Sequence, residues 1–194
     1  MASDGSLHSG SLSRASLERQ LAQCEMLLSE GKGSADLWHQ HGYYLTKLKY
    51  YSRAIASYRR ALLSNPQDAR LWCNYGSALA IEDRLEDAVS AYERALAIEP
   101  NYTNVWRRRG KVLYQLGQYE QAIGSYEQAL DLSPEDSRLW HAKGLANYRL
   151  NRHEQAIHCF QTAINYKQDN REAHLALAYV LIDSDRTDEA LTCL

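Results

Sequence analysis

The chain has few of the features that mark secreted, membrane or metal-binding proteins. Its four cysteines include no C-x2-C pair, so neither a zinc site nor a disulfide framework is predicted. No apolar run approaches the roughly 18 residues that span a bilayer, and the first residues, MASDGSLHSGSLSR, resemble no secretory signal. The formal net charge of −2 gives little general attraction to nucleic acid. These absences favour a cytoplasmic protein.

The residue patterns of catalytic sites are also missing. The seven histidines form no H-E-x-x-H pair. The stretch Gly31–Ser34 lacks the upstream glycine of a phosphate-binding loop, and no strand is predicted before it. A segment that begins at Asp183 starts like a calcium loop but has Asp188 where such loops need glycine. We therefore predict that the chain is not an enzyme and binds neither a metal nor a cofactor.

What the chain does contain is periodic. The four tryptophans, a glycine four residues after each, and the only three prolines recur every 34 residues. These are Trp38, Trp72, Trp106 and Trp140; Gly42, Gly76, Gly110 and Gly144; and Pro66, Pro100 and Pro134. An aromatic slot has the same period and holds Tyr58, Tyr92, Tyr126 and Phe160. A fixed period of this length is typical of stacked helical repeats.

Each period also has the pattern of two amphipathic helices. Apolar residues recur at helical spacing in both halves of the unit, and a short connector makes the two helices antiparallel neighbours. The glycine and the alanines allow the helix backbones to approach closely. The proline, which lacks an amide hydrogen and has a fixed φ, ends the second helix.

The motif W-x3-G, A-x3-[YF]-x2-A and P resembles the tetratricopeptide repeat (TPR) family over residues 35–194. The resemblance implies an all-α fold, a right-handed superhelical solenoid of antiparallel helix pairs. It gives repeats at 35–68, 69–102, 103–136 and 137–170, and a partial repeat at 171–194. Residues 14–34 are predicted to form a capping helix from a degenerate leading repeat, and residues 1–13 a disordered segment.

The last repeat departs from the pattern. His174 replaces the tryptophan and Gln168 the proline, so we expect the register to loosen after residue 167. The sequence also stops at Leu194, inside a predicted helix and at the aromatic slot. We therefore expect the chain to be a fragment of a longer polypeptide, with an uncapped end through which it could self-associate.

In this family, positions 2, 5, 6, 9, 12 and 13 of the first helices line a concave groove that binds peptides. Carried onto this chain, those positions predict a partner-binding groove at Arg70, Asn74, Arg107, Arg108, Lys111, Tyr114, Arg138, His141, Tyr148 and Arg149. Acidic residues on this face, Asp36, Glu172 and Asp183, lie toward the two ends. Positive charge in the middle favours an acidic protein segment. The alternative is an ordinary solvated helix face with no ligand.

Two finer features of the groove also follow from the resemblance. Some family members hold a terminal carboxylate with a Lys-Asn-Asn-Lys-Arg set, but only Asn74 and Arg108 match it here, so this clamp is not predicted. Arg109 and Lys143 occupy position 7, which is usually apolar. We expect their stems to pack while their charged ends reach outward and extend the basic strip.

The resemblance thus implies a non-catalytic protein–protein interaction scaffold that binds an acidic peptide segment in its groove. One alternative is the repeat arm of a larger enzyme, such as a glycosyltransferase or kinase, that positions substrates. Single-stranded RNA binding is disfavoured, since related helical repeats that read RNA run nearer 35 residues. We expect protein partners, no nucleic acid and no membrane insertion.

Overall fold

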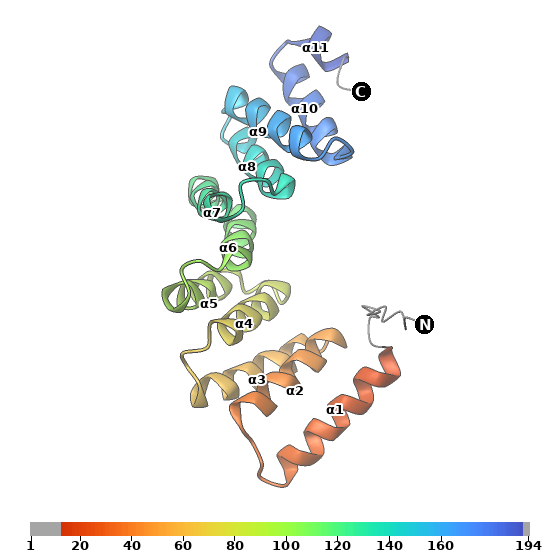
Figure 1. Cartoon of the computed structure of the whole chain (residues 1–194), viewed down its shortest axis with the longest axis vertical. Coiled ribbons are helices and arrows are strands. Elements are labelled where there is room, and N and C mark those ends of the chain that lie inside the picture. The colour runs from red at the N-terminus through yellow and green to blue at the C-terminus, as the bar shows by residue number, and fades with distance from the viewer. Residues whose placement is uncertain (1–12, 192–194) are drawn as a thin grey trace, which may run out of the picture. The chain divides into compact units, whose positions relative to one another are not determined.

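The computed structural model describes residues 13–191, and every regular element in that range is an α-helix (Figure 1). This confirms the predicted all-α class. The segment 1–13, predicted to be disordered, lies outside the described residues except for Ser13, whose side chain caps the first helix. Cys193 also lies outside them. The helices form two compact units, Met1–Pro66 and Gln67–Leu194.

The first unit contains α1 (Arg14–Ser29), α2 (Ala35–Lys47) and α3 (Tyr51–Ser64). Helix α2 packs along α3, and α1 packs on α2 through a buried face that includes Leu17, Leu21 and Cys24. The buried His41 of α2 lies with its Nδ1 2.8 Å from Ser57 Oγ on α3. These contacts join all three helices around one small core.

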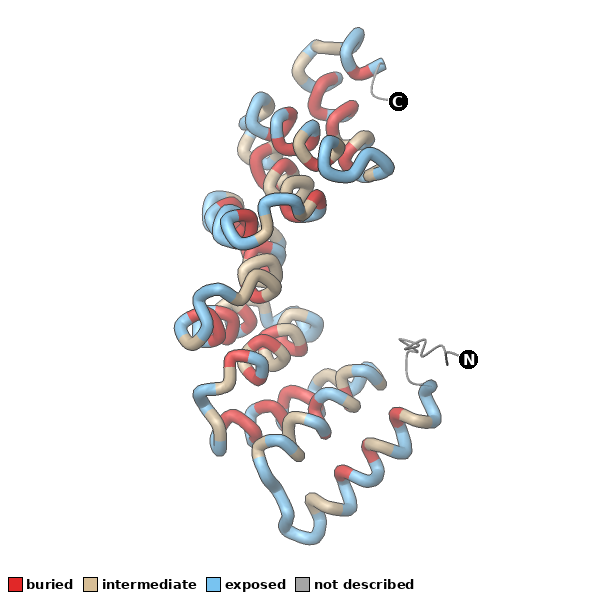
Figure 2. The backbone as a smooth tube through the Cα atoms, in the orientation of Figure 1, coloured by how far each residue is buried: buried red, intermediate tan, exposed pale blue. Residues whose placement is uncertain are grey.

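The second unit alternates two kinds of helix. The first helices of its pairs are α4 (Ala69–Ile81), α6 (Thr103–Gln115), α8 (Ser137–Arg149) and α10 (Arg171–Asp183). The second helices are α5 (Leu85–Ile98), α7 (Tyr119–Leu132), α9 (His153–Tyr166) and the short α11 (Thr187–Leu191). Each helix packs against the next along the chain, and Figure 2 shows buried residues along every helix from α4 to α10. The unit is a helical solenoid.

The turn inside each pair depends on one residue in the left-handed region. Asp83, Asn151 and Asp185 have φ of 60°, 56° and 58°, and Gly117 has φ of 75°. These positions are 34 residues apart and follow the first helices. Asp, Asn and Gly are the residues that adopt this conformation most readily. Asp185 therefore serves the turn between α10 and α11.

The repeated glycine and the repeated aromatic residue pack together within each pair. A Cβ added to Gly144 would lie 2.5 Å from Cε1 of Phe160, and one added to Gly110 would lie 2.6 Å from Cε1 of Tyr126. Phe160 and Tyr126 are 1% and 3% exposed. The aromatic ring thus lies directly against the glycine backbone, which fixes the approach of the two helices.

The tryptophan and the proline of the repeat are joined by a hydrogen bond. Trp106 and Trp140 donate from Nε1 to the carbonyl oxygens of Pro100 and Pro134, each at 2.7 Å. In the last pair, His174 Nε2 lies 3.0 Å from the carbonyl oxygen of Gln168, six residues earlier as in the other pairs. The contact is therefore kept although His174 replaces the tryptophan and Gln168 replaces the proline. The expected loosening of the register does not reach α10.

Candidate protein-interaction surface

The first helices form one face of the second unit. Helix α4 lies beside α6, α6 beside α8, and α8 beside α10, whereas the second helices α5, α7 and α9 make no such contacts with one another. Helices that approach on one side and diverge on the other curve the array toward the first helices. We call this surface the inner face; all ten residues of the predicted groove belong to the first helices α4, α6 and α8.

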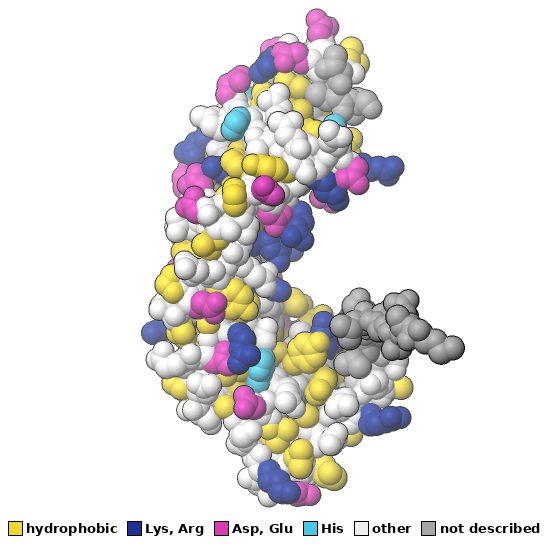
Figure 3. Space-filling model, in the orientation of Figure 1, with side chains coloured by type: hydrophobic (Ala, Val, Ile, Leu, Met, Phe, Trp, Pro, Cys, Tyr) yellow, Lys and Arg dark blue, Asp and Glu magenta, His cyan; other side chains and the backbone are white. Residues whose placement is uncertain are grey.

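Three cations of α6 form the centre of the inner face, and we call Arg107, Arg108 and Lys111 the α6 basic cluster. Figure 3 shows Lys and Arg side chains gathered beside α6 and α8. Arg107 donates to Asn104 Oδ1 at 2.7 Å, Arg108 donates to Ser77 Oγ at 3.0 Å, and Lys111 is exposed. Within residues 13–191, none of the three has a carboxylate at ion-pair distance. Their positive charge is therefore uncompensated by a direct partner.

Arg108 also joins two helix pairs. Ser77 of α4 accepts its hydrogen bond and a second one from the hydroxyl of Tyr92 on α5, at 3.2 Å. The Nε of Arg108 is buried and has no hydrogen-bond partner. Burial raises the pKa of Tyr92, so its hydroxyl remains a donor at neutral pH. Arg108 is therefore half-buried and contributes to both packing and charge.

A cavity of about 510 Å³ lies between α4 and α6 in front of these groups. Its lining includes Ser77, Ile81, Asp83, Arg108 and Lys111. Lys111 in this lining is exposed, and Ile81, which is 54% exposed, supplies an apolar part of it. The cavity can accept an amphipathic group beside two cations, with Asp83 as the one acidic neighbour.

Two other arginines of the predicted groove each form an ion pair with the aspartate that caps the start of their own helix. Arg70 and Arg138 lie 3.0 and 2.9 Å from the carboxylates of Asp68 and Asp136, which also accept backbone N–H bonds as N-caps. The hydrogen bond from the side chain of Arg138 holds the pKa of Asp136 below its ordinary value. These pairs reduce the positive charge at both sites and leave the α6 basic cluster as the stronger centre.

The remaining groove residues make contacts within the protein. Arg149 stacks over Tyr119 and Tyr114, with its Cζ 5.0 and 5.9 Å from the ring centroids. The hydroxyl of Tyr148 donates to Asp183 Oδ2 at 3.4 Å. His141 packs against Phe160, and burial lowers its pKa. Asn74 is half-buried on α4. On α8, the predicted groove residues Arg149, Tyr148 and His141 thus contact aromatic rings or a neighbouring carboxylate within the protein.

The expectation for Arg109 and Lys143 is wrong. Their side chains are 17% and 20% exposed, and they point toward the second helices instead of extending the basic strip. Arg109 pairs with Glu93 on α5 at 2.8 Å, and Lys143 pairs with Glu127 on α7 at 2.8 Å. Each cation thereby links its own pair to the preceding one, because the partly buried charge needs a partner.

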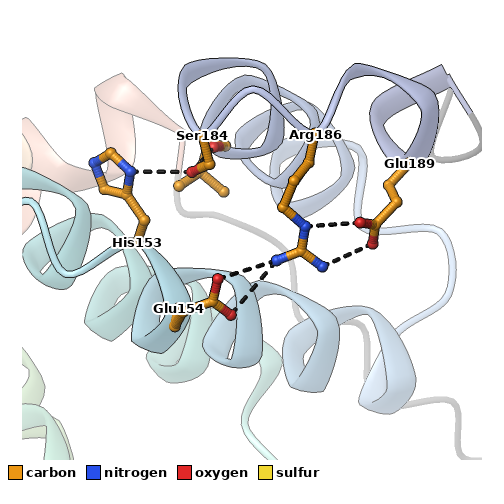
Figure 4. Close-up of polar contacts among 6 residues, drawn as sticks. His153, Glu154, Ser184, Arg186 and Glu189 are labelled. Atoms are coloured by element: carbon orange, nitrogen blue, oxygen red, sulfur yellow. Dashed lines mark hydrogen bonds and ion pairs between the residues drawn. The ribbon is translucent and has the colours of Figure 1, made fainter.

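A polar cluster that the sequence pattern did not predict lies where α9 meets the turn between α10 and α11 (Figure 4). His153 Nδ1 lies 3.0 Å from Ser184 Oγ, and Arg186 pairs with both Glu154 and Glu189. Ser184 donates to the carbonyl of Val180 at 2.7 Å, so its hydroxyl hydrogen is engaged within its own helix end. The cluster therefore fastens α10 and α11 to α9. The repeat register contained the signal, because Arg152 and Glu120 form the equivalent pair one period earlier, at 3.5 Å.

Among residues 13–191, no helix has the length and apolar character needed to span a bilayer. In the same range, no three His, Cys, Asp or Glu side chains are grouped so that they could hold a metal ion.

Structural comparison identifies similar folds. A crystal structure of MamA has a TM-score of 0.77 and 20% identity, and the match covers 80% of this chain and 91% of that one. "MamA 41-end from Desulfovibrio magneticus RS-1" has a TM-score of 0.79 and 22% identity, covering 82% and 90%. YrrB, described as a TPR protein with an unusual peptide-binding site, has a TM-score of 0.75 and 18% identity, covering 88% of both chains. At these identities the likeness concerns the fold.

Sequence comparison identifies the family. No curated protein matches the chain. Family models described as TPR repeat and tetratricopeptide repeat match residues 110–151 and 91–124. A further tetratricopeptide repeat model matches residues 41–103 and 141–192, which together make up more than half of the chain. With the helix pairs and the repeated signature contacts, these matches show that the chain belongs to the tetratricopeptide repeat family.

Proposed function

We propose that the chain is a non-catalytic protein-interaction scaffold that binds an acidic segment of a partner protein on its inner face. The observation that carries this proposal is the α6 basic cluster, because Arg108 and Lys111 line a cavity and none of its three cations has a direct carboxylate partner within the described residues. The free, buried thiols of Cys24, Cys73 and Cys159 suit a reducing compartment such as the cytoplasm.

The charge distribution of the second unit favours this choice of ligand. Arg109, Lys143 and Arg186 are paired with glutamates away from the inner face, and Arg70 and Arg138 with aspartates at its helix starts. The three cations of the α6 basic cluster have no equivalent partner within the described residues, so their field extends into the cavity between α4 and α6. A carboxylate bound there would lie beside Arg108 and Lys111, which both line the cavity.

Lys111 is the best position at which to test the proposal, because its exposed side chain contributes charge without the packing role of Arg108. We expect Lys111→Glu to weaken binding of a fluorescein-labelled (Asp-Gly)4 peptide by about tenfold in low salt, since repulsion replaces attraction. Fluorescence anisotropy would measure the dissociation constant. Binding by the wild type should also weaken steeply as salt is added.

The matched control is Arg94→Glu, which makes the same charge change at an exposed residue of α5, a second helix. It should leave the affinity within about twofold of the wild type, because the charge lies off the inner face. Equal losses in the two variants would show that net charge alone governs binding. That result, or no binding of the acidic peptide by the wild type, would refute the proposal.

A further inference from the structure

Helix α10 exposes an apolar stripe on the side opposite its core contacts. Leu175, Tyr179 and Ile182 are 52%, 69% and 51% exposed and follow one another at helical spacing. The other side of the helix packs Leu177 and Leu181 against α9. Three large apolar side chains on one exposed stripe are more than the isolated exposed residues of an ordinary surface.

The stripe belongs to the same rows of positions as the α6 basic cluster. Leu175 is two periods after Arg107, and Tyr179 is two periods after Lys111. The contact between His174 and Gln168 keeps α10 in register, and α8 lies between α6 and α10 in contact with both. A ligand lying along the inner face would therefore pass from cations on α6 to apolar groups on α10.

Between α6 and α10, the side chains of the inner face change in charge and polarity from one first helix to the next. The residues of α8 that lie one period after Arg107 and Lys111 are His141 and Leu145, and both are half-buried. On α10, the exposed carboxylates Glu172 and Asp183 flank the stripe. These two acids disfavour a negative group on α10, whereas the cations of α6 favour one. The inner face thus distinguishes the two ends of a bound segment.

We propose that the bound segment has two parts: acidic residues that contact α6 and large apolar residues that cover Leu175, Tyr179 and Ile182. This proposal rests on the proposed function and specifies its ligand. Packed helices lie about 8–10 Å apart, so α6 and α10 are separated by about 16–20 Å. An extended peptide advances about 3.3 Å per residue, which places the two parts about five or six residues apart.

The test compares fluorescein-labelled peptides on the full chain. One peptide joins three aspartates to Leu-Phe through a four-residue Gly/Ser spacer, and a second has the reverse order, since either chain direction could fit. A third peptide keeps the aspartates and spacer but replaces Leu-Phe with Ser-Ser. We expect one two-part peptide to bind about tenfold more tightly than the acidic peptide, and Tyr179→Ser to abolish that advantage.

The acidic peptide is the internal control, because Tyr179→Ser should leave its affinity unchanged. Thermal melts check the fold, and an exposed substitution should leave the melting temperature close to that of the wild type. If the acidic peptide binds but neither two-part peptide gains affinity, this inference fails and the proposed function stands. If no peptide binds, both fail. A wild-type dimer that Tyr179→Ser makes monomeric would identify a second copy as the occupant and overturn the inference.

Discussion

Gly144→Val is expected to lower the free energy of unfolding of the 67–194 unit by about 3 kcal/mol. A Cβ at this position would lie 2.5, 2.8 and 3.0 Å from three ring carbons of Phe160. That ring is enclosed, with 1% of its surface exposed, so it cannot move aside without opening the contact between α8 and α9. Urea unfolding followed by circular dichroism would measure the loss.

Gly124→Ala is the matched control for this substitution. Gly124 lies inside α7, and an added Cβ would have no atom within 4 Å. Alanine should therefore stabilise the helix by about 0.5–1 kcal/mol, because glycine loses more backbone entropy on folding. A Gly144→Val protein as stable as the wild type would mean that the close packing of glycine against the aromatic ring does not fix the helix pair.

Tyr126→Ala should be at least as damaging, with an expected loss of about 3–5 kcal/mol. The ring of Tyr126 is 3% exposed and packs among Leu113, Ala122 and Leu139, so its removal leaves a cavity in a core shared by two helix pairs. Because neighbouring repeats stabilise one another, the loss should extend to α8. Hydrogen exchange would locate it along the chain.

Tyr126→Phe separates the contribution of the ring from that of the hydroxyl. The equivalent slot in the next pair holds Phe160, which packs on its glycine without a hydroxyl. Burial raises the pKa of Tyr126, so the hydroxyl is uncharged at neutral pH. We expect Phe to change the stability by less than about 0.5 kcal/mol. A loss comparable to that of Ala would assign the stabilisation to the hydroxyl instead.

The sequence predicts the fold class well because the repeat contacts are local and carried by scarce residue types. Gly144 and Phe160, or Trp140 and Pro134, meet within one helix pair or across one short loop, so their spacing alone indicates their contact. Lys143 was less predictable. Its partner Glu127 lies on a preceding second helix, and no local pattern indicates which way a long cationic side chain will turn.

The candidate site could be predicted only in part, because the pairing of its charged side chains also depends on contacts that the sequence pattern does not show. The resemblance indicates which positions share the inner face, but it does not indicate which charges are already paired. The bond between Asp136 and Arg138 depends on the geometry of a helix start, and that between Arg108 and Ser77 on the distance between α4 and α6. The prediction favoured arginines because their charge suggests a ligand. The apolar stripe at Tyr179 was not predicted, because its spacing is the same as that of an ordinary buried helix face.

A charge exchange on α6 tests the proposed acidic-segment site most directly. In one protein, Arg107 and Lys111 are both replaced by glutamate, and binding of (Asp-Gly)4 and (Lys-Gly)4 peptides is measured by anisotropy for this variant and the wild type. The wild type should prefer the acidic peptide, and the variant should prefer the basic one by a comparable factor. If both proteins keep the same preference, or bind neither peptide, the α6 basic cluster is not the binding site.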